Sequence, residues 1–273
     1  MAVAETKKVL IVVRTYPVPA QKGVEVSCTA AITEQGDWVR LFPIPYRFLS
    51  PDQRFKKYQW VSVSVIKPRD DKRPESFRLI EDSIRILSAP LSVADNWEAR
   101  KRIVLPLKKH CLCCLKRERD EKEFPTLGIF KPKIIKKLIM EPEKNTTWTQ
   151  DQLNKLRQTD FFRKSPVAEL EKVPYAFKYE FTCDHEGCSG HTLSCTDWEM
   201  GQSWRSWKNK YGDGWKAKFL ERYETEMIEK NDTHFFVGTV HKYPENWIIV
   251  GLFYPRKELN SPQPGLFNGS SAP

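Results

Sequence analysis

Residues 183–195 read CDHEGCSGHTLSC and bring four metal-ligating side chains into one short segment. These side chains follow the spacing C-x4-C-x2-H-x3-C and are Cys183, Cys188, His191 and Cys195. Zn²⁺ in structural sites prefers four thiolate or imidazole ligands in a tetrahedron, and a closed set adds folding energy while leaving no position for substrate. The segment therefore predicts a structural zinc site in a C-terminal α+β domain.

Alternatives to this ligand set stay open at this stage. The cluster could hold no metal, or a metal with an open catalytic position. His185 could also replace one ligand, or Cys195 could be a buried thiol ahead of a helix. The remaining cysteines are Cys28, Cys111, Cys113 and Cys114. We interpret them either as ordinary thiols or as part of a second metal site. Seven cysteines, two of them adjacent, favour thiols and metal ligation over a secreted disulfide framework.

The N-terminal part of the chain is rich in short β-branched and aromatic runs. Residues 61–65 read VSVSV and alternate with period two, as expected of a half-buried strand. Similar runs occupy 7–17, 24–33 and 37–44, and EQGD at 34–37 is a plausible hairpin turn between two of them. We predict a small antiparallel β-barrel, OB-like, over residues 1–90.

The rest of the chain mixes helical and strand patterns, so the predicted fold class is α+β. Residues 91–172 are interpreted as a basic connecting region, and residues 173–255 as the zinc-cluster domain. The second of these contains helical patterns and a final pair of apolar runs, HFFVGTVH and NWIIVGLFY, typical of a hairpin. Residues 256–273 lose periodicity and gain Pro, Gly and Ser, so a disordered tail is predicted there.

Charge and hydrophobicity narrow the class of protein. The chain has 273 residues, 45 Lys+Arg against 35 Asp+Glu, and 40% hydrophobic residues, so it can build a core while carrying a net charge of +10. No apolar stretch reaches the length of a membrane span, and no secretory signal is recognisable at the start. We expect a cytoplasmic protein without a membrane partner.

Basic and aromatic residues together indicate nucleic acid as a partner. Eight Lys or Arg lie between residues 100 and 119, and we expect phosphate contacts from Arg100, Lys101, Arg102, Lys108 and Lys109. Aromatic residues alternate with cations in the β-rich part, and those expected to stack on bases are Phe42, Tyr46 and Trp60. The competing interpretation is that these rings fill the barrel while the charges keep it soluble.

Two acids directly follow the cysteine cluster, in TDWE at residues 196–199. If this segment is extended, Asp197 and Glu199 point to one face and could hold Mg²⁺, as in a metal-dependent nuclease. A nuclease would also need a lysine, and only Lys208 or Lys210 lies nearby in the sequence. The favoured interpretation is a capping box, Thr196 with Glu199, that opens the following helix. Within that helix the apolar stripe at Met200, Trp204, Trp207 and Tyr211 is typical of a core face.

The first 70 residues resemble the dual OB-fold modules of prokaryotic proteins of nucleic-acid metabolism and defence. The likeness lies in VSCTAAI, then a turn, then GDWVRLFPI; this chain has VRLFPIP where those modules have arginine followed directly by proline. The resemblance implies an OB-like barrel near nucleic acid and assigns no functional residue.

The sequence thus predicts a zinc-containing nucleic-acid-binding protein, in the setting of a prokaryotic antiviral defence or nucleic-acid-processing system. One alternative is a metal-dependent nuclease, which would use Asp197, Glu199 and Mg²⁺. The other is a protein-interaction subunit of a larger complex.

Overall fold

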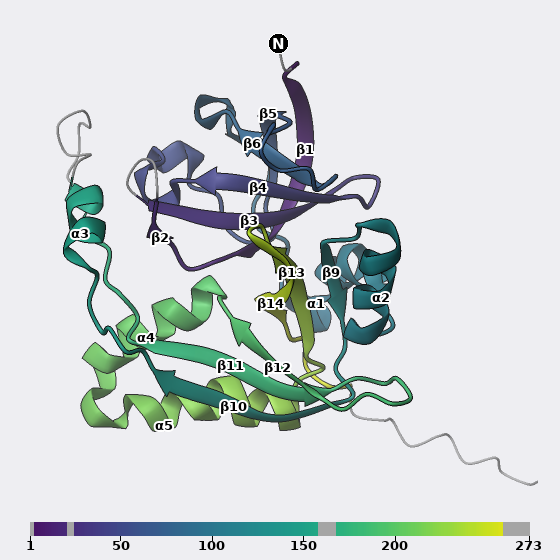
Figure 1. Cartoon of the computed structure of the whole chain (residues 1–273), viewed down its shortest axis with the longest axis vertical. Coiled ribbons are helices and arrows are strands. Elements are labelled where there is room, and N and C mark those ends of the chain that lie inside the picture. The colour runs from purple at the N-terminus through teal and green to yellow at the C-terminus, as the bar shows by residue number, and fades with distance from the viewer. Residues whose placement is uncertain (1–2, 21–24, 158–167, 259–273) are drawn as a thin grey trace, which may run out of the picture.

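The first sheet closes into a barrel because its first strand has a partner on both sides. In the computed structural model, which describes residues 3–20, 25–157 and 168–258, β1 pairs antiparallel with both β3 and β5. The five strands follow one another around the barrel in the order β1 (Glu5–Arg14), β3 (Glu25–Thr33), β4 (Trp38–Ile44), β6 (Ser76–Leu79) and β5 (Trp60–Ile66). All neighbours are antiparallel except the parallel pair β4 and β6. The predicted small barrel is confirmed (Figure 1).

Burial along the strands follows the sequence pattern. In β5 the valines Val61, Val63 and Val65 are buried inside the barrel and alternate with half-buried residues. In β1 all five residues from Val9 to Val13 are buried, since Val9 and Ile11 face the barrel core and the others pack against the second half of the molecule. The predicted turn at 34–37 joins β3 to β4, with Gly36 at a φ of +88°.

Short elements complete the barrel region. They are β2 (Val18–Pro19), η1 (Tyr46–Phe48), η2 (Pro51–Gln53), η3 (Glu81–Ser83) and β7 (Arg85–Ile86).

The second sheet collects strands from most of the remaining chain. Its order is β10 (Ile134–Pro142), β11 (Tyr175–Thr182), β12 (His191–Cys195), β14 (Tyr243–Phe253), β13 (His234–Val240), β9 (Leu127–Phe130) and β8 (Lys108–Lys109). Three of these strands, β8 to β10, come from the segment interpreted as a connecting region, so this segment contributes directly to the C-terminal sheet. Strands β13 and β14 form the expected hairpin.

The remaining helices follow the barrel strands in the chain. They are α1 (Ala94–Val104), η4 (Leu105–Leu107), α2 (Leu112–Lys122), α3 (Gln150–Arg157), α4 (Trp198–Tyr211), η5 (Gly212–Gly214), α5 (Trp215–Leu220) and the π-helix η6 (Glu221–Lys230). Three residues at the start of α1, Asp95, Asn96 and Trp97, have left-handed backbone with φ between 50° and 66°. The right-handed part of α1 therefore begins only after Trp97.

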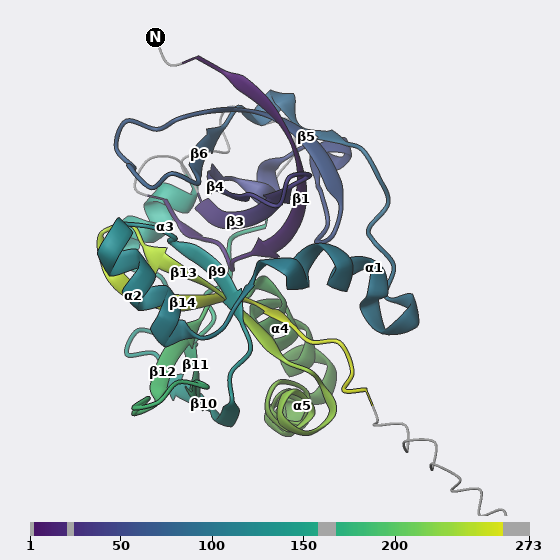
Figure 2. The same ribbon diagram turned by 90° about the vertical axis from the view of Figure 1, so that its right-hand side faces the viewer.

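Each half of the molecule has its own core, and a third apolar cluster joins them. Helices α4 and α5 lie against one face of the second sheet, where Met200 and Phe219 pack with Phe177 and Tyr179 (Figure 1). Figure 2 shows the barrel above this sheet and α1 beside the contact between them. No helix within the described ranges is long and apolar enough to cross a membrane.

A buried arginine reinforces the contact between the two halves. Arg40, on β4 of the barrel, donates to the carbonyl oxygens of Thr126 (2.7 Å) and Thr239 (3.1 Å), both in the second half. Its guanidinium also lies 3.8 Å from the Glu75 carboxylate. Buried polar groups need partners of this kind, so the two halves are held together by polar as well as apolar contacts.

Candidate functional site

Three thiols and one imidazole meet at the side of the second sheet. The ligand atoms of Cys113, Cys183, Cys188 and His191 all lie within 4.8 Å of one another. His191 Nε2 lies 3.2 Å from Cys113 Sγ and 3.5 Å from Cys188 Sγ. Ligands of a tetrahedral zinc are about 3.5–3.8 Å apart, given bond lengths of about 2.0–2.3 Å. The group therefore has the chemistry and nearly the spacing of a four-ligand metal centre.

Local chain geometry brings three of these ligands together. Cys183 follows the end of β11, Cys188 lies in the connecting loop, and His191 opens β12. The loop turns at Gly187 and Gly190, whose φ values of +76° and +98° favour glycine. The Cys183 amide donates to Cys188 Sγ at 3.3 Å, so the loop already points this sulfur inward.

The fourth ligand differs from the sequence prediction. Cys195 is not in the group, and Cys113, from the first turn of α2, takes its place. The physical reason is that Cys195 lies four residues beyond His191 on an extended strand, which puts it about 13 Å away. It is only 5% exposed, and burial raises the pKa of its thiol. Cys195 is thus the buried thiol that the sequence left as an alternative.

The electrostatics of the centre suit a cation. Burial, together with the charge of Lys116, lowers the pKa of His191, so its imidazole is neutral and able to bind metal near neutral pH. The Cys183 amide lowers the pKa of Cys188, whereas burial raises the pKa of Cys113 to about 12. A bound cation would stabilise both thiolates, because a metal ligand must give up its proton.

The other three cysteines lie apart from this group. Cys28 is on β3 in the barrel, where its sulfur is close to Arg40. Cys111 and Cys114 are in the same helical turn as Cys113, but they contact each other, with their sulfur atoms 2.7 Å apart.

The two acids after the cluster open α4, as the favoured interpretation predicted. The capping residue is Asp197, however, and not Thr196. Asp197 Oδ1 accepts from the Glu199 amide at 2.6 Å, and Oδ2 accepts from the Leu252 amide at 3.0 Å. The Thr196 hydroxyl faces the Ile249 carbonyl at 3.4 Å, so it is turned toward β14. Both oxygens of Asp197 are therefore engaged by backbone amides.

A lysine from the barrel lies between these acids. Lys57 Nζ is 3.5 Å from Asp197 Oδ2 and 3.4 Å from Glu199 Oε1. The side chains of Lys57 and Asp197 are 10% and 1% exposed, and that of Glu199 is 39% exposed. Burial alone would lower the pKa of Lys57, but the two carboxylates outweigh it and raise this pKa well above its ordinary value. Burial raises the pKa of Asp197, whereas Lys57 outweighs burial at Glu199 and lowers that pKa.

Aromatic rings and cations surround this junction between the halves. The Arg14 guanidinium lies 3.7 Å from the centre of the Tyr46 ring and 3.9 Å from that of Trp198. The Tyr254 hydroxyl donates to Glu199 at 3.1 Å. The sequence placed Lys208 or Lys210 near the acids; Lys57 was missed because it is 140 residues away from Asp197.

The residues expected to contact nucleic acid differ in exposure and in their partners. Phe42 is 46% exposed, while Tyr46 stacks on Arg14 and Trp60 is half-buried under Lys8. Arg100 lies over the Tyr58 ring at 4.1 Å and donates to the Leu91 carbonyl. Lys101 and Arg102 both pair with Glu98, Lys109 pairs with Glu118, and Lys108 is exposed. Most of these side chains thus have a partner within the protein, and their contact with nucleic acid stays a prediction.

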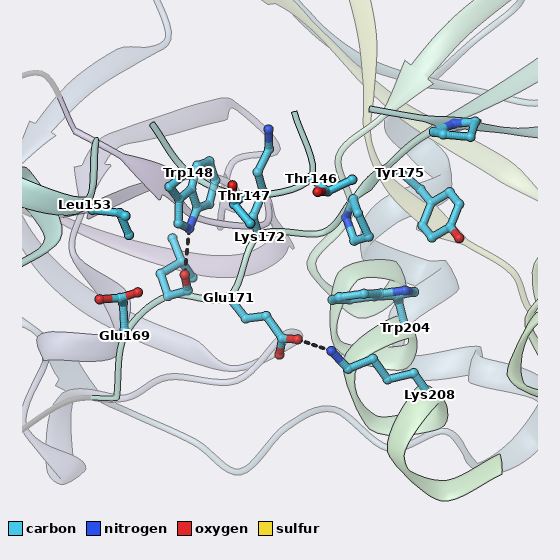
Figure 3. Close-up of a pocket in the computed structure, with 13 residues that line it drawn as sticks. Thr146, Thr147, Trp148, Leu153, Glu169, Glu171, Lys172, Tyr175, Trp204 and Lys208 are labelled. Carbon is cyan, nitrogen blue, oxygen red and sulfur yellow. Dashed lines mark hydrogen bonds and ion pairs between the residues drawn. The ribbon is translucent and has the colours of Figure 1, made fainter. Parts of the chain in front are cut away.

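An aromatic pocket that the sequence did not predict lies beside α4. Its volume is about 560 Å³, and Trp148, Tyr175 and Trp204 line it (Figure 3). Lys208 pairs with Glu171 at its edge. A neighbouring hollow of about 400 Å³ shares Trp148 and Tyr175 with it.

Comparison with known families divides the chain at nearly the same place as the fold does. A model described as Domain of unknown function (DUF8757) matches residues 108–271, more than half of the chain, and the chain belongs to this family. A second model, Domain of unknown function (DUF8758), matches residues 5–106, which contain the barrel. No curated protein matches the sequence.

Proposed function

We propose that this protein is a zinc-containing nucleic-acid-binding protein. A structural zinc would be held by Cys113, Cys183, Cys188 and His191, and phosphates would contact the basic surface around this centre. The observation that carries the proposal is that Cys113 comes from α2, where Lys116 and Arg117 follow it, whereas its three partners come from the β11–β12 loop and the first residue of β12. A metal bound there would fix the helix against the loop and the adjoining edge strand.

Cations lie on both sides of the centre. Lys116 and Arg117 follow Cys113 by three and four residues, so they lie on the same side of α2. On the other side, the Lys133 amide donates to the Thr182 carbonyl at 2.9 Å, directly before Cys183. We call the following set the centre-flanking surface: Lys116, Arg117, Lys133, Lys136 and Lys137.

Phosphates can reach this surface at low energetic cost. Within the described residues Lys116 and Arg117 have no ion-pair partner, and Lys133, Lys136 and Lys137 pair only with Asp184 or Glu180. The side chains of these three lysines are between 48% and 59% exposed, and exposed ion pairs contribute about 0–1 kcal/mol to stability. A polyanion can therefore replace them, and release of its counterions makes the binding weaken steeply with salt.

Charge reversal on this surface tests the proposal. Binding of fluorescent single- and double-stranded oligonucleotides is measured by anisotropy over a series of salt concentrations. Lys116→Glu with Arg117→Glu should weaken binding and lower the salt slope by roughly two, one for each phosphate that the variant no longer neutralises. The matched control is Lys216→Glu with Lys242→Glu, which makes the same charge change at exposed positions outside this surface. The proposal is refuted if the two double variants weaken oligonucleotide binding equally. It is also refuted if the wild-type protein shows no binding at micromolar concentrations even at low salt.

The metal is tested on the purified protein itself. Thiolate and imidazole ligands in a closed set select zinc among the common divalent ions. Elemental analysis should give one zinc per chain, together with nucleic acid identified in the same preparation. A chain with seven cysteines and a metal-ligating group suits a reducing compartment, and a cytoplasmic location is part of this proposal.

The barrel supports the same function through its architecture. A closed five-stranded barrel is the form used by OB-folds, which bind oligonucleotides on their surface. Together with the resemblance of the first 70 residues to dual OB-fold modules, this favours a role in prokaryotic nucleic-acid processing or antiviral defence.

A second candidate, a metal-dependent nuclease, is favoured by one observation: Lys57 supplies the lysine that the acidic pair lacked in the sequence. Mg²⁺ would then have to compete with Lys57 for Asp197 and Glu199. Cleavage of DNA or RNA with Mg²⁺ or Mn²⁺, abolished by Glu199→Gln, would support it; Glu199 is the better target because Asp197 also caps α4. If the protein instead binds a partner protein, sizing chromatography in high salt will still show the complex.

A further inference from the structure

We propose that Cys111 and Cys114 form a peroxide-sensitive thiol pair, oxidised to a disulfide beside the metal centre without dismantling it. This inference rests on the zinc site of the proposed function but does not depend on nucleic-acid binding. It assigns a modification site whose co-reactant is a hydroperoxide.

The two sulfur atoms are already placed for a bond. Cys111 Sγ and Cys114 Sγ are 2.7 Å apart, and a disulfide bond is about 2.03–2.05 Å long. Cys111 caps the N-terminus of α2, and its sulfur accepts from the Cys114 amide at 3.1 Å. Closing the bond therefore needs only a small shift within one helical turn.

The adjacent metal ligand points elsewhere. Cys113 Sγ lies 3.2 Å from His191 Nε2, and neither Cys111 nor Cys114 belongs to the metal-binding group. Successive residues of an α-helix differ in direction by about 100°, so Cys113 and Cys114 face different sides of α2. Oxidation of the pair leaves all four ligands in place.

The exposure of the two thiols decides the order in which they react. Cys114 is partly exposed and Cys111 is fully buried, so a peroxide reaches Cys114 first. The Cys114 sulfur attacks one peroxide oxygen, the O–O bond breaks, and the thiol proton leaves in the first water, which gives a sulfenic acid. The Cys111 sulfur then displaces the hydroxyl group, which takes the Cys111 proton and leaves as a second water. The two thiols lose two electrons, and the peroxide is reduced by two.

Mass spectrometry of one tryptic peptide shows whether the disulfide has formed. Zinc-loaded full-length protein is treated with one equivalent of hydrogen peroxide, denatured, alkylated and digested with trypsin. Cleavage after Lys109 and Lys116 yields HCLCCLK, which contains all three cysteines of the helix start. We expect this peptide to carry one alkyl group instead of three and to lose two mass units, while a chromogenic chelator detects no released zinc.

Variants decide which sulfurs react. Cys111→Ser and Cys114→Ser should each abolish the disulfide while keeping one zinc per chain, and Cys28→Ser, a distant thiol, should leave it unchanged. The proposal is overturned if the wild-type peptide keeps three alkyl groups, if the disulfide persists in Cys114→Ser, or if zinc is released as the disulfide forms. Cys113→Ser should still form the disulfide; if that variant does not fold, the two other serine variants still decide the question.

Discussion

Replacing Cys113 or Cys195 by serine separates the two possible ligand sets. In the structure Cys113 is a member of the metal-binding group and Cys195 is buried on β12. We expect Cys113→Ser to lose most of the stability that the protein gains from zinc, and Cys195→Ser to keep it. The quantity compared is the free energy of unfolding with zinc minus that after chelation. This difference cancels the packing cost of each substitution.

The expected size of this stability difference follows from the length of the chain loop that the metal closes. A metal that joins Cys113 to Cys183 closes a loop of about 70 residues, and the entropy of closing such a loop corresponds to about 4.5 kcal/mol. A metal held only within residues 183–195 would close about 13 residues, which corresponds to about 3 kcal/mol. Loss of Cys113 also removes one metal–sulfur bond, so the total loss should exceed the difference of about 1.5 kcal/mol between these loops.

Urea titrations with and without a chelator measure this difference for each variant. Cobalt substitution gives an independent reading, because the sulfur-to-metal charge-transfer band should weaken when one of three thiolates is removed. The reasoning is refuted if Cys195→Ser loses the metal-linked stability and the cobalt band while Cys113→Ser keeps both.

Three further predictions concern buried charges. Lys57→Met should lower the free energy of unfolding by about 3–5 kcal/mol, because it leaves the carboxylate of Asp197, whose side chain is 1% exposed, without a positive partner. Urea titration measures this change. A loss below about 1 kcal/mol, the value of an exposed ion pair, would contradict the prediction. Burial lowers the pKa of His234 from its ordinary 6.5, so the unfolded chain binds a proton more readily than the folded protein does. The free energy of unfolding should therefore fall as the pH drops through and below 6.5. His234→Asn should flatten the slope of unfolding free energy against pH. Arg40→Met removes the donors to two buried carbonyls and should cost about 3–5 kcal/mol; an unchanged melting temperature would count against it.

Local sequence patterns predicted the elements well, because each depends on neighbouring residues. The alternation at 61–65 is a strand of the barrel, the turn at 34–37 is present, and the acids at 197 and 199 open α4. The four metal ligands were predicted as one segment for the same reason, and three of them are in the group.

Contacts between distant residues were not predictable from spacing. Cys113 is 78 residues from His191, and Lys57 is 140 residues from Asp197. The sequence left Cys113 open as an ordinary thiol or as part of a second metal site, but nothing local indicated that its segment would pack beside His191. Leu112 and Leu115 decide this, since both are fully buried in the core of the second half and hold α2 against the sheet.

The metal centre and the acidic junction lie at opposite ends of one strand. His191 is the first residue of β12, Cys195 is its last, and Asp197 follows two residues later. At the far end the chain is held on several sides: the Thr196 amide donates to the Ile249 carbonyl, the Tyr16 amide donates to the Thr196 carbonyl, and Lys57 pairs with Asp197. Because a strand fixed at both ends cannot slip in register without breaking one of these attachments, a metal at His191 also secures the position of Asp197. A metal bound to this group would thus stabilise the contact with the barrel as well as its own loop.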